Sequence, residues 1–168
     1  PKLHITLVQA ISRGERMDYC LQKATELGVA AVQLLNTERV EVRLDERRAE
    51  KRMAHWQGVI ISACEQSGRA CIPQLLEPVS LAEWCQTATE TQNLVLDPDA
   101  EHRLVEVNTG QQRPVTILIG PEGGLSRAEM QILQLAGVKA VSFGPRILRT
   151  ETAGPAAIAV LLSRSGDL

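Results

Sequence analysis

Short apolar runs alternate with longer runs of helical periodicity along the whole sequence, and this alternation limits the fold more than any other feature. The short runs are expected strands, at 3–8, 31–35, 72–76, 93–96, 115–119 and 140–143. The run at 115–119 is apolar throughout, which is typical of a strand buried on both faces. Strands that alternate with helices favour an α/β fold around a mainly parallel sheet.

Helix boundaries are marked by capping motifs and glycines. A Ser followed three residues later by Glu forms a capping box, and the sequence contains three: Ser12/Glu15, Ser80/Glu83 and Ser126/Glu129. Glycines at 28, 68 and 137 are expected to end helices. We expect helices at 12–27, at 45–66, after Ser80, from Asp99, from Ser126 to Gly137 and at 151–162.

Composition limits the partners that the chain can take. The 168 residues, 44% of them hydrophobic, suffice for one domain with a core. Because 18 Lys and Arg face 20 Asp and Glu, the net charge is -2, and a polyanion must meet a local basic patch. Four aromatic residues, Tyr19, Trp56, Trp84 and Phe143, are too few for the base-stacking platforms of RRM or OB modules.

We expect neither a metal site nor a membrane segment. The four cysteines form no CxxC pair and the three histidines are isolated, so no metal site is predicted. The longest apolar stretches, such as 156–162, are too short to span a membrane, and no signal sequence is present. We therefore expect a cytoplasmic protein, and the start at Pro1 without an initiator methionine suggests a piece of a longer chain.

Two loops carry the sequence features of a ligand site, since ligands of α/β folds bind beyond the carboxyl ends of the strands. The first loop, 120–126, has three glycines but neither a Walker motif nor GxGxxG. It is either an ordinary strand-to-helix turn or a loop that approaches a ligand closely. Because Glu122 would repel phosphate, a cation or a neutral heterocycle is the more natural ligand. We interpret Glu122 mainly as an acceptor for neighbouring loop amides.

The second loop, 143–153, combines apolar and charged residues at the start of the last expected helix. Glu151 falls in the first helical turn, where the helix dipole favours it. Arg146 and Arg149 lie just before that turn. Two arginines at this position indicate phosphate or carboxylate recognition, and solvated surface side chains remain the alternative.

These loops resemble those of a known family. The segments GPEGGLS at 120–126 and GPRILRTETA at 144–153 are similar to signature stretches of the RsmE family of 16S ribosomal RNA methyltransferases. Further matches are at 16–18, 22–28, 37–39 and 65–69, so the resemblance covers nearly the whole chain. Several segments that match in order are far more specific than one glycine-rich loop.

The resemblance implies a fold, a cofactor and partners. The family belongs to the SPOUT class, an α/β domain whose C-terminal trefoil knot holds S-adenosylmethionine. By this resemblance residues 1–168 form one SPOUT domain, a homodimer that methylates N3 of one uridine in the 16S rRNA of the small ribosomal subunit. The small N-terminal RNA-binding β-barrel of PUA type that family members carry has no counterpart in this sequence.

By the same resemblance, three loops make the cofactor pocket: the segment after Leu96, the loop at 120–124 and the turn at 143–148. The expected cofactor-binding residues are Leu96, Leu118, Ile119, Gly120, Gly124, Phe143, Gly144, Ile147 and Leu148. Arg149 is the candidate for the contact to a developing oxyanion or an adjacent phosphate, and Glu151 for a general base or an orienting acceptor. We expect Arg13, Arg16, Arg69 and Arg146 to contact the RNA backbone.

Three alternatives stand beside this prediction. A ribose 2′-O-methyltransferase would share the SPOUT fold, and the Arg-Thr-Glu-Thr segment at 149–152 favours the uridine-N3 enzyme over it. A non-catalytic RNA-binding or assembly module would keep the fold without turnover. A Rossmann-type small-molecule enzyme is disfavoured, because GxGxxG and the acidic ribose clamp are missing.

Overall fold

The computed structural model describes residues 3–39, 46–87, 91–108 and 113–168. Six strands form one sheet in the order β3-β2-β1-β5-β4-β6, and every neighbouring pair is parallel. The strands are β1 (Ile5–Ala10), β2 (Ala31–Asn36), β3 (Gln74–Ser80), β4 (Gln92–Leu96), β5 (Val115–Ile119) and β6 (Lys139–Val141). The α/β class and the parallel sheet are thereby confirmed.

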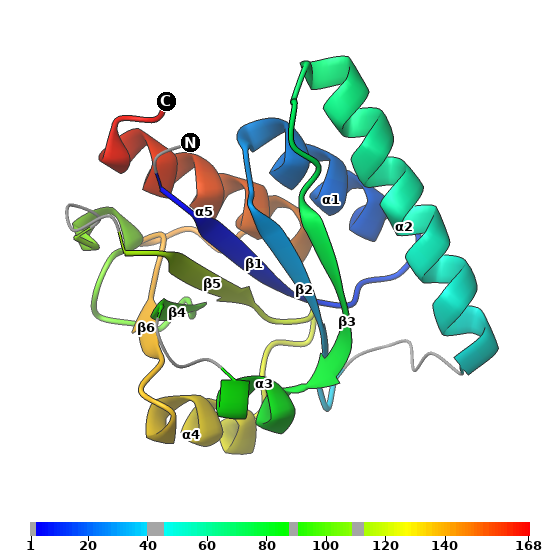
Figure 1. Cartoon of the computed structure of the whole chain (residues 1–168). Coiled ribbons are helices and arrows are strands. Elements are labelled where there is room, and N and C mark those ends of the chain that lie inside the picture. Colours follow the sequence, from blue (N-terminus) through cyan, green and yellow to red (C-terminus); the bar gives the residue numbers. More distant parts are fainter. Residues whose placement is uncertain (1–2, 40–45, 88–90, 109–112) are drawn as a thin grey trace.

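Helices cover both faces of the sheet. Figure 1 shows α1 (Glu15–Leu27), α2 (Glu46–Ser67) and α5 (Thr150–Ser165) on one face. The other face carries α3 (Leu81–Thr87) and α4 (Arg127–Leu135). A short 3₁₀ helix, η1 (Leu104–Glu106), follows β4 and packs near α5. The result is a three-layer arrangement with the sheet in the middle.

The core has two parts because successive side chains of a strand point to opposite faces. Leu7 of β1 and Ile117 of β5 belong to the cluster that packs with α1, α2 and α5. Their neighbours Val8 and Leu118 belong to the cluster that packs with α3 and α4. All four side chains are fully buried, so β1 and β5 have the apolar character expected of central parallel strands.

Two of the three capping boxes are confirmed. At the start of α4 the hydroxyl of Ser126 accepts from the backbone N–H of Glu129 at 3.1 Å, and the Glu129 carboxylate accepts from the N–H of Ser126 at 2.8 Å. At α3, Ser80 and Glu83 form the corresponding pair. The third prediction is wrong: Gly14, with φ of 55°, precedes α1, and no side chain caps that end. Ser12 lies buried before it.

Two further predictions of elements are corrected. The described residues 100–108 form no α-helix. The chain runs instead to η1, where the N–H of Leu104 donates to the carbonyl of Ser142, the residue after β6, at 2.8 Å. The strand predicted at 72–76 is observed at Gln74–Ser80. It contains Pro78, which an edge strand tolerates because one side of the strand needs no N–H donor.

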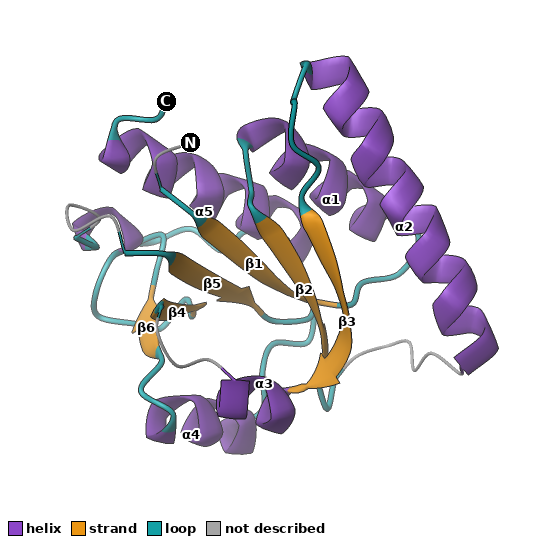
Figure 2. Ribbon diagram, viewed as in Figure 1, coloured by secondary structure: helices purple, strands orange, loops and turns teal. Residues whose placement is uncertain are grey.

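The sheet brings the ends of β4, β5 and β6 together. Since these strands are parallel, their carboxyl ends lie at one edge of the sheet, and the loops that follow them are neighbours (Figure 2). The chain leaves β6, the strand beyond β4, and returns to α5, which packs on β1 and β5. The returning segment therefore passes the loop that follows β5.

Candidate functional site

A cavity of about 670 Å³ lies where the loops after β4, β5 and β6 meet. Its wall consists of Arg16, Leu96, Asp97, Pro98, Asp99, Ile119, Gly120, Pro121, Glu122, Gly124, Leu125, Met130, Phe143, Arg146, Ile147, Leu148, Arg149, Thr150, Glu151 and Ala153. Loop residues supply most of this wall, and buried strand ends supply its floor. The volume falls within the range of roughly 300–1,000 Å³ typical of small-molecule sites.

The glycine-rich loop after β5 forms one side of the cavity. Gly124 has φ of 70°, a left-handed conformation that costs a glycine little and strains other residues. The N–H of Gly124 donates to the Pro121 carbonyl at 2.9 Å, which closes a tight turn. The loop thus turns sharply before α4 and presents backbone to the cavity.

The segment after β6 forms the opposite side. Gly144 has φ of 75°, and a Cβ at this position would lie 3.2 Å from the guanidinium of Arg103. A side chain here would be strained and would displace Arg103. Close packing at Gly144 therefore fixes where the following residues, Arg146 to Leu148, enter the wall.

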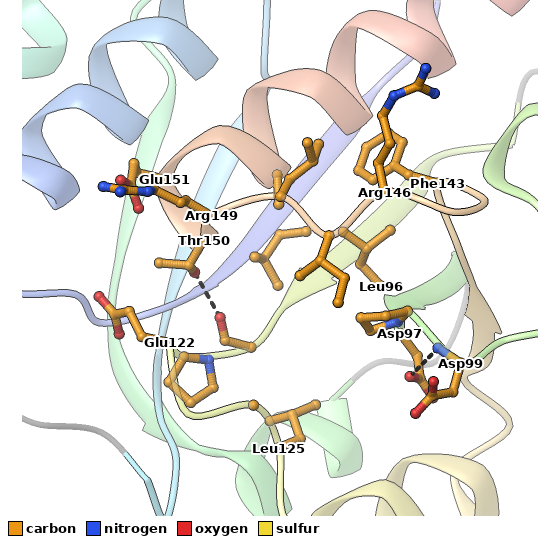
Figure 3. Close-up of a pocket in the computed structure, with 18 of the residues that line it drawn as sticks. Leu96, Asp97, Asp99, Glu122, Leu125, Phe143, Arg146, Arg149, Thr150 and Glu151 are labelled. Carbon is orange, nitrogen blue, oxygen red and sulfur yellow. Dashed lines mark hydrogen bonds between the residues drawn. The ribbon is translucent and has the colours of Figure 1, made fainter.

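Thr150 connects the two sides. Its hydroxyl donates to the carbonyl of Gly120 at 2.7 Å (Figure 3). The same hydroxyl accepts from Nε2 of Gln9 at 3.1 Å. The Oε1 atom of Gln9 in turn accepts from the Cys20 thiol at 3.3 Å. Gln9, Cys20 and Thr150 are all buried, so this chain of hydrogen bonds joins β1, α1 and α5 to the glycine-rich loop.

Glu122 has a different partner from the expected one. Its Oε1 atom accepts from Nη1 of Arg16 at 3.2 Å, across 106 positions of sequence. The prediction that Glu122 accepts from loop amides is therefore corrected: in the described residues its hydrogen bond comes from α1. The contact is exposed and contributes little to stability, but it draws α1 to the rim of the cavity.

Charged groups surround an apolar centre. In Figure 3, Glu122, Arg149 and Glu151 stand on one side and Asp97 and Asp99 on the other. Asp97 is held in its turn, because its Oδ1 atom accepts from the N–H of Asp99 at 3.0 Å. The wall contains four carboxylates and three guanidinium groups, one of them paired with Glu122. This arrangement suits a ligand that has an apolar body and a positive charge.

The structure brings most of the predicted cofactor residues together. The cavity wall contains Leu96, Ile119, Gly120, Gly124, Phe143, Ile147 and Leu148. Two predicted residues lie outside it. Leu118 is fully buried on the other face of β5, with the core of α3 and α4, and Gly144 packs against Arg103.

Both predicted catalytic residues line the cavity. Arg149 is exposed at the position before α5, and Glu151 is half-buried in the first turn of that helix. Glu151 also affects a thiol in the core. Burial of Cys20, together with the negative charge of the Glu151 carboxylate, raises the pKa of the Cys20 thiol to about 12. Cys20 therefore stays a neutral thiol and is no nucleophile.

The four arginines predicted to contact RNA lie in different places. Arg16 and Arg146 line the cavity, and in Figure 3 the Arg146 side chain extends away from its centre. Arg13 is exposed in the turn before α1. Arg69 lies at the opposite end of the sheet, where its guanidinium donates to the carbonyls of Thr25 and Val29 at 2.7 and 3.0 Å.

Several wall residues were not among the predicted ones. They are Asp97, Pro98, Asp99, Pro121, Leu125, Met130, Thr150 and Ala153. Asp97 to Asp99 lie in the segment after Leu96, which the resemblance assigns to the pocket, but none of the three was singled out from the sequence. The rule that ligands bind beyond strand ends indicates the same segment. Thr150 gave no such signal, because its role depends on Gly120, 30 positions away.

The described residues show no candidate for a metal centre or a membrane span. In residues 3–39, 46–87, 91–108 and 113–168, no group of three or more His, Cys, Asp or Glu side chains is placed to hold a metal ion. None of the helices in these ranges is both long and apolar enough to cross a membrane.

Comparisons with known proteins agree with this fold and place the chain in a family. A family model described as an RNA methyltransferase domain matches residues 1–162. Ribosomal RNA small subunit methyltransferase E of Buchnera aphidicola subsp. Schizaphis graminum is 37% identical over 167 residues, which are 99% of this chain and 68% of that protein. The protein of the same name from Mycobacterium bovis is 34% identical, covering 95% of this chain and 64% of its own length.

A solved structure shares the architecture. The crystal structure of a ribosomal RNA small subunit methyltransferase E from Neisseria gonorrhoeae, bound to S-adenosyl methionine, matches with a TM-score of 0.89 and 42% identity over 96% of this chain and 66% of that one. The fold and the matching family model define an RNA methyltransferase domain. Within this class, the chain belongs to the ribosomal RNA small subunit methyltransferase E family. It spans about two thirds of the length of these relatives.

Proposed function

We propose that this chain is the catalytic domain of an S-adenosylmethionine-dependent methyltransferase that acts on N3 of a uridine in 16S ribosomal RNA. The observation that carries the proposal is the cavity at the carboxyl ends of β4, β5 and β6, in a chain of the methyltransferase E family. The relative from Neisseria gonorrhoeae was solved with S-adenosyl methionine bound. The choice of uridine N3 follows from the resemblance of the loops at 120–126 and 144–153.

The cavity fits this cofactor in chemistry as well as in size. Leu96, Ile119 and Leu148 offer apolar contacts to a flat adenine ring, and the backbone near Gly120 offers hydrogen bonds to its edge. Asp97 is one of the carboxylates that favour a ligand with positive charge. We assign the cofactor to these residues.

The reaction needs alignment and charge stabilisation. When bound, S-adenosylmethionine supplies a methyl group on a sulfonium sulfur, and this sulfur is left as a neutral thioether once its bond to the methyl carbon is replaced by a carbon–nitrogen bond. The protein must hold the uracil ring in line with that carbon, and ideal alignment can remove about 7 to 11 kcal/mol of the barrier. It must also take the N3 proton, because uracil is neutral at physiological pH.

Arg149 and Glu151 are the residues that we assign to these tasks. Glu151 accepts the N3 proton, directly or by orienting the group that does, from its half-buried place in the cavity wall. Arg149 donates to O2 or O4 of the uracil, where negative charge develops, or to an adjacent phosphate. A guanidinium suits either acceptor because its charge does not depend on pH.

RNA would approach over the rim of the cavity. Arg146 is exposed beside it, and Arg13 and Arg16 are exposed at the start of α1. The net charge of -2 leaves no general attraction to RNA, so these side chains supply the local positive surface. We do not include Arg69 in this surface, since its guanidinium binds two carbonyls at the other end of the sheet.

A C-terminal trefoil knot is part of the proposal. The path of the chain supports it: β6 lies beyond β4 in the sheet, yet α5 packs on β1 and β5. The returning segment is bonded to the loop after β5 through Thr150 and Gly120. Such a crossing would explain how two distant loops form one pocket.

A homodimer in the cytoplasm completes the proposal. Leu135 of α4 is 90% exposed and Ile147 at the cavity is 81% exposed, and a second copy would cover such side chains favourably. Sedimentation at micromolar concentration is expected to give twice the mass of the chain. A single-chain mass at all concentrations would contradict the dimer.

Calorimetry followed by mass spectrometry tests the proposed activity. The protein should release or absorb heat with S-adenosylmethionine, whereas a module without a cofactor site gives none. Small subunits from a strain lacking the enzyme should then gain one methyl group, which digestion and mass spectrometry locate on a uracil base. A methyl group on a ribose would support the 2′-O alternative instead.

A further inference from the structure

Two helices begin with the same capping motif, but their glutamates have different partners. Glu83 of α3 is exposed, and its Oε2 atom accepts from the N–H and the hydroxyl of Ser80 at 2.8 and 2.7 Å. Glu129 of α4 is only 3% exposed. Its Oε2 atom accepts from the N–H of Ser126, and its Oε1 atom accepts from the N–H of Glu38 at 2.8 Å, across 91 positions of sequence.

A carboxylate with this degree of burial requires strong partners. Removal of a charged group from water is costly unless hydrogen bonds replace those with water. Glu129 has two backbone N–H donors at 2.8 Å and lies in the first turn of α4, where the helix dipole favours negative charge. Local capping needs only one of these two bonds. The other bond, from the N–H of Glu38, connects α4 to the turn after β2.

The same turn makes a second contact with the glycine-rich loop. Nη1 of Arg39 donates to the carbonyl of Gly123 at 2.9 Å. A Cβ on Gly123 would lie 3.5 Å from Cβ of Arg39, so the two backbones run close together. Residues 37–39 are thereby bound to the segment 123–126 at two points, through Arg39 and through Glu129.

The contact of Arg39 with Gly123 and the contact of Glu129 with Glu38 together form a clamp, which lies outside the cavity. Gly120, Pro121, Glu122 and Gly124 belong to the cavity wall, but neither Glu129 nor Arg39 does. A glycine-rich loop loses much conformational freedom when it is ordered, so external contacts decide how well its ligand-binding shape is prepared. The clamp and the hydrogen bond from Thr150 hold the loop at its two ends.

We propose that Glu129 is a positioning residue for the cofactor cavity, with Arg39 as its second arm: together they fix the glycine-rich loop against the turn after β2 in the shape that binds the cofactor. Neither side chain touches the cofactor. The inference rests on the proposed function, because S-adenosylmethionine is the ligand that reports on the loop. Neither Glu129 nor Arg39 belongs to the cavity wall.

The test compares the same substitution in the two capping motifs. In Glu129→Gln the side chain keeps its size, but its NH₂ group cannot accept, so one of the two backbone N–H groups loses its partner. Glu83→Gln makes the same change in a motif without the second link. We expect the Kd for S-adenosylmethionine to rise roughly tenfold in Glu129→Gln, equal to about 1.4 kcal/mol, and to stay unchanged in Glu83→Gln.

Arg39→Ala supplies a second variant that should fold normally, because Arg39 is exposed. We expect a smaller rise of its Kd, roughly threefold, since one exposed hydrogen bond is lost. In the variant that combines Glu129→Gln with Arg39→Ala, the rise in Kd should be smaller than the product of the two single rises, because both side chains act on the same loop. Calorimetry well below the melting temperature of every variant separates this effect from a loss of stability.

Hydrogen exchange gives a readout that needs no ligand. Amides in 120–126 should exchange faster in Glu129→Gln and in Arg39→Ala than in the wild type and in Glu83→Gln. A lower melting temperature for Glu129→Gln with unchanged exchange and unchanged Kd would reduce Glu129 to a structural cap and overturn the inference. If the wild type bound no S-adenosylmethionine, the proposed function would fail, and the exchange rates would still decide about the clamp.

Discussion

At the scale of single residues, Arg149 is the side chain on which the proposed chemistry depends most. It is exposed, lines the cavity and precedes the first turn of α5, so its loss leaves the core unchanged. We predict that Arg149→Ala lowers kcat by about 10²–10³, the usual effect of removing one donor to a developing oxyanion. The Kd for S-adenosylmethionine should change little. The measurement is single-turnover methylation of small subunits.

Arg113→Ala is the matched control for this variant. Arg113 is also exposed but lies before the amino end of β5, away from the cavity. Its substitution should leave kcat unchanged. A wild-type rate for Arg149→Ala would remove Arg149 from the catalytic residues.

Cys20 gives a prediction about pH. Burial and the negative charge of Glu151 raise the pKa of its thiol from 9.0 to about 12. Between pH 9 and about pH 12, the Cys20 thiol therefore keeps its proton in the folded chain and loses it in the unfolded chain. The free energy of unfolding should therefore be insensitive to this group below pH 9 and fall above it by up to about 1.4 kcal/mol per pH unit.

Denaturant titrations from pH 8 to 10.5 measure this slope. Cys20→Ser keeps a donor for Gln9 but does not titrate in this range, so it should show a smaller decrease than the wild type. Equal slopes for the two proteins would mean that the thiol does not remain protonated in the folded state.

At the scale of elements, the hydrogen bond between α5 and the glycine-rich loop is expected to support both stability and binding. Thr150→Val keeps the shape of the side chain but removes the donor to the Gly120 carbonyl and leaves Nε2 of Gln9 with the Ala10 carbonyl as its acceptor. We predict a loss of about 1–3 kcal/mol in the free energy of unfolding, and weaker binding of S-adenosylmethionine. Thermal and chemical denaturation measure the first effect, and calorimetry the second.

Thr150→Ser is the control, because it keeps the hydroxyl. It should remain close to the wild type in cofactor affinity. If Thr150→Val bound the cofactor as tightly as Thr150→Ser, the bond to Gly120 would not shape the cavity.

Local signals in the sequence predicted the elements well. The capping boxes at Ser80 and Ser126 were found because their partners lie three residues away. The box predicted at Ser12 was wrong, because Gly14 occupies the position before α1 and Ser12 is buried ahead of it. A motif of two residues cannot show whether its serine will be at the surface or in the core.

Contacts between distant segments could not be predicted in this way. The partners of Glu122, Gly123 and Gly120 lie 106, 84 and 30 positions away, and no local pattern indicates them. The positions of the loops were predictable, because ligand loops follow strand ends in parallel sheets. The side chains that hold these loops depend on the order of the strands.

At the scale of the whole molecule, RNA binding should depend on a few arginines and on salt. Because the chain has a net charge of -2, each arginine at the rim accounts for a large share of the attraction. We predict that Arg146→Ala makes the slope of log K against log salt less steep by about 0.7–0.9, the value for one lost phosphate contact. Filter binding of the rRNA between low and moderate salt measures the slope.

Arg69→Ala should behave differently from Arg146→Ala. Its guanidinium holds the carbonyls of Thr25 and Val29, so its loss should lower stability without changing the salt slope. A reduced slope for Arg69→Ala would restore it to the RNA surface. An unchanged slope for Arg146→Ala would remove that residue from it.

We place the binding site for the methyl donor at the loops after β4, β5 and β6. A crystal structure of this protein with S-adenosylhomocysteine would locate the ligand. We expect density for the ligand between Leu96, Gly120 and Leu148, within the cavity of about 670 Å³. Well-defined density at any other place, or none at saturating ligand, would contradict it.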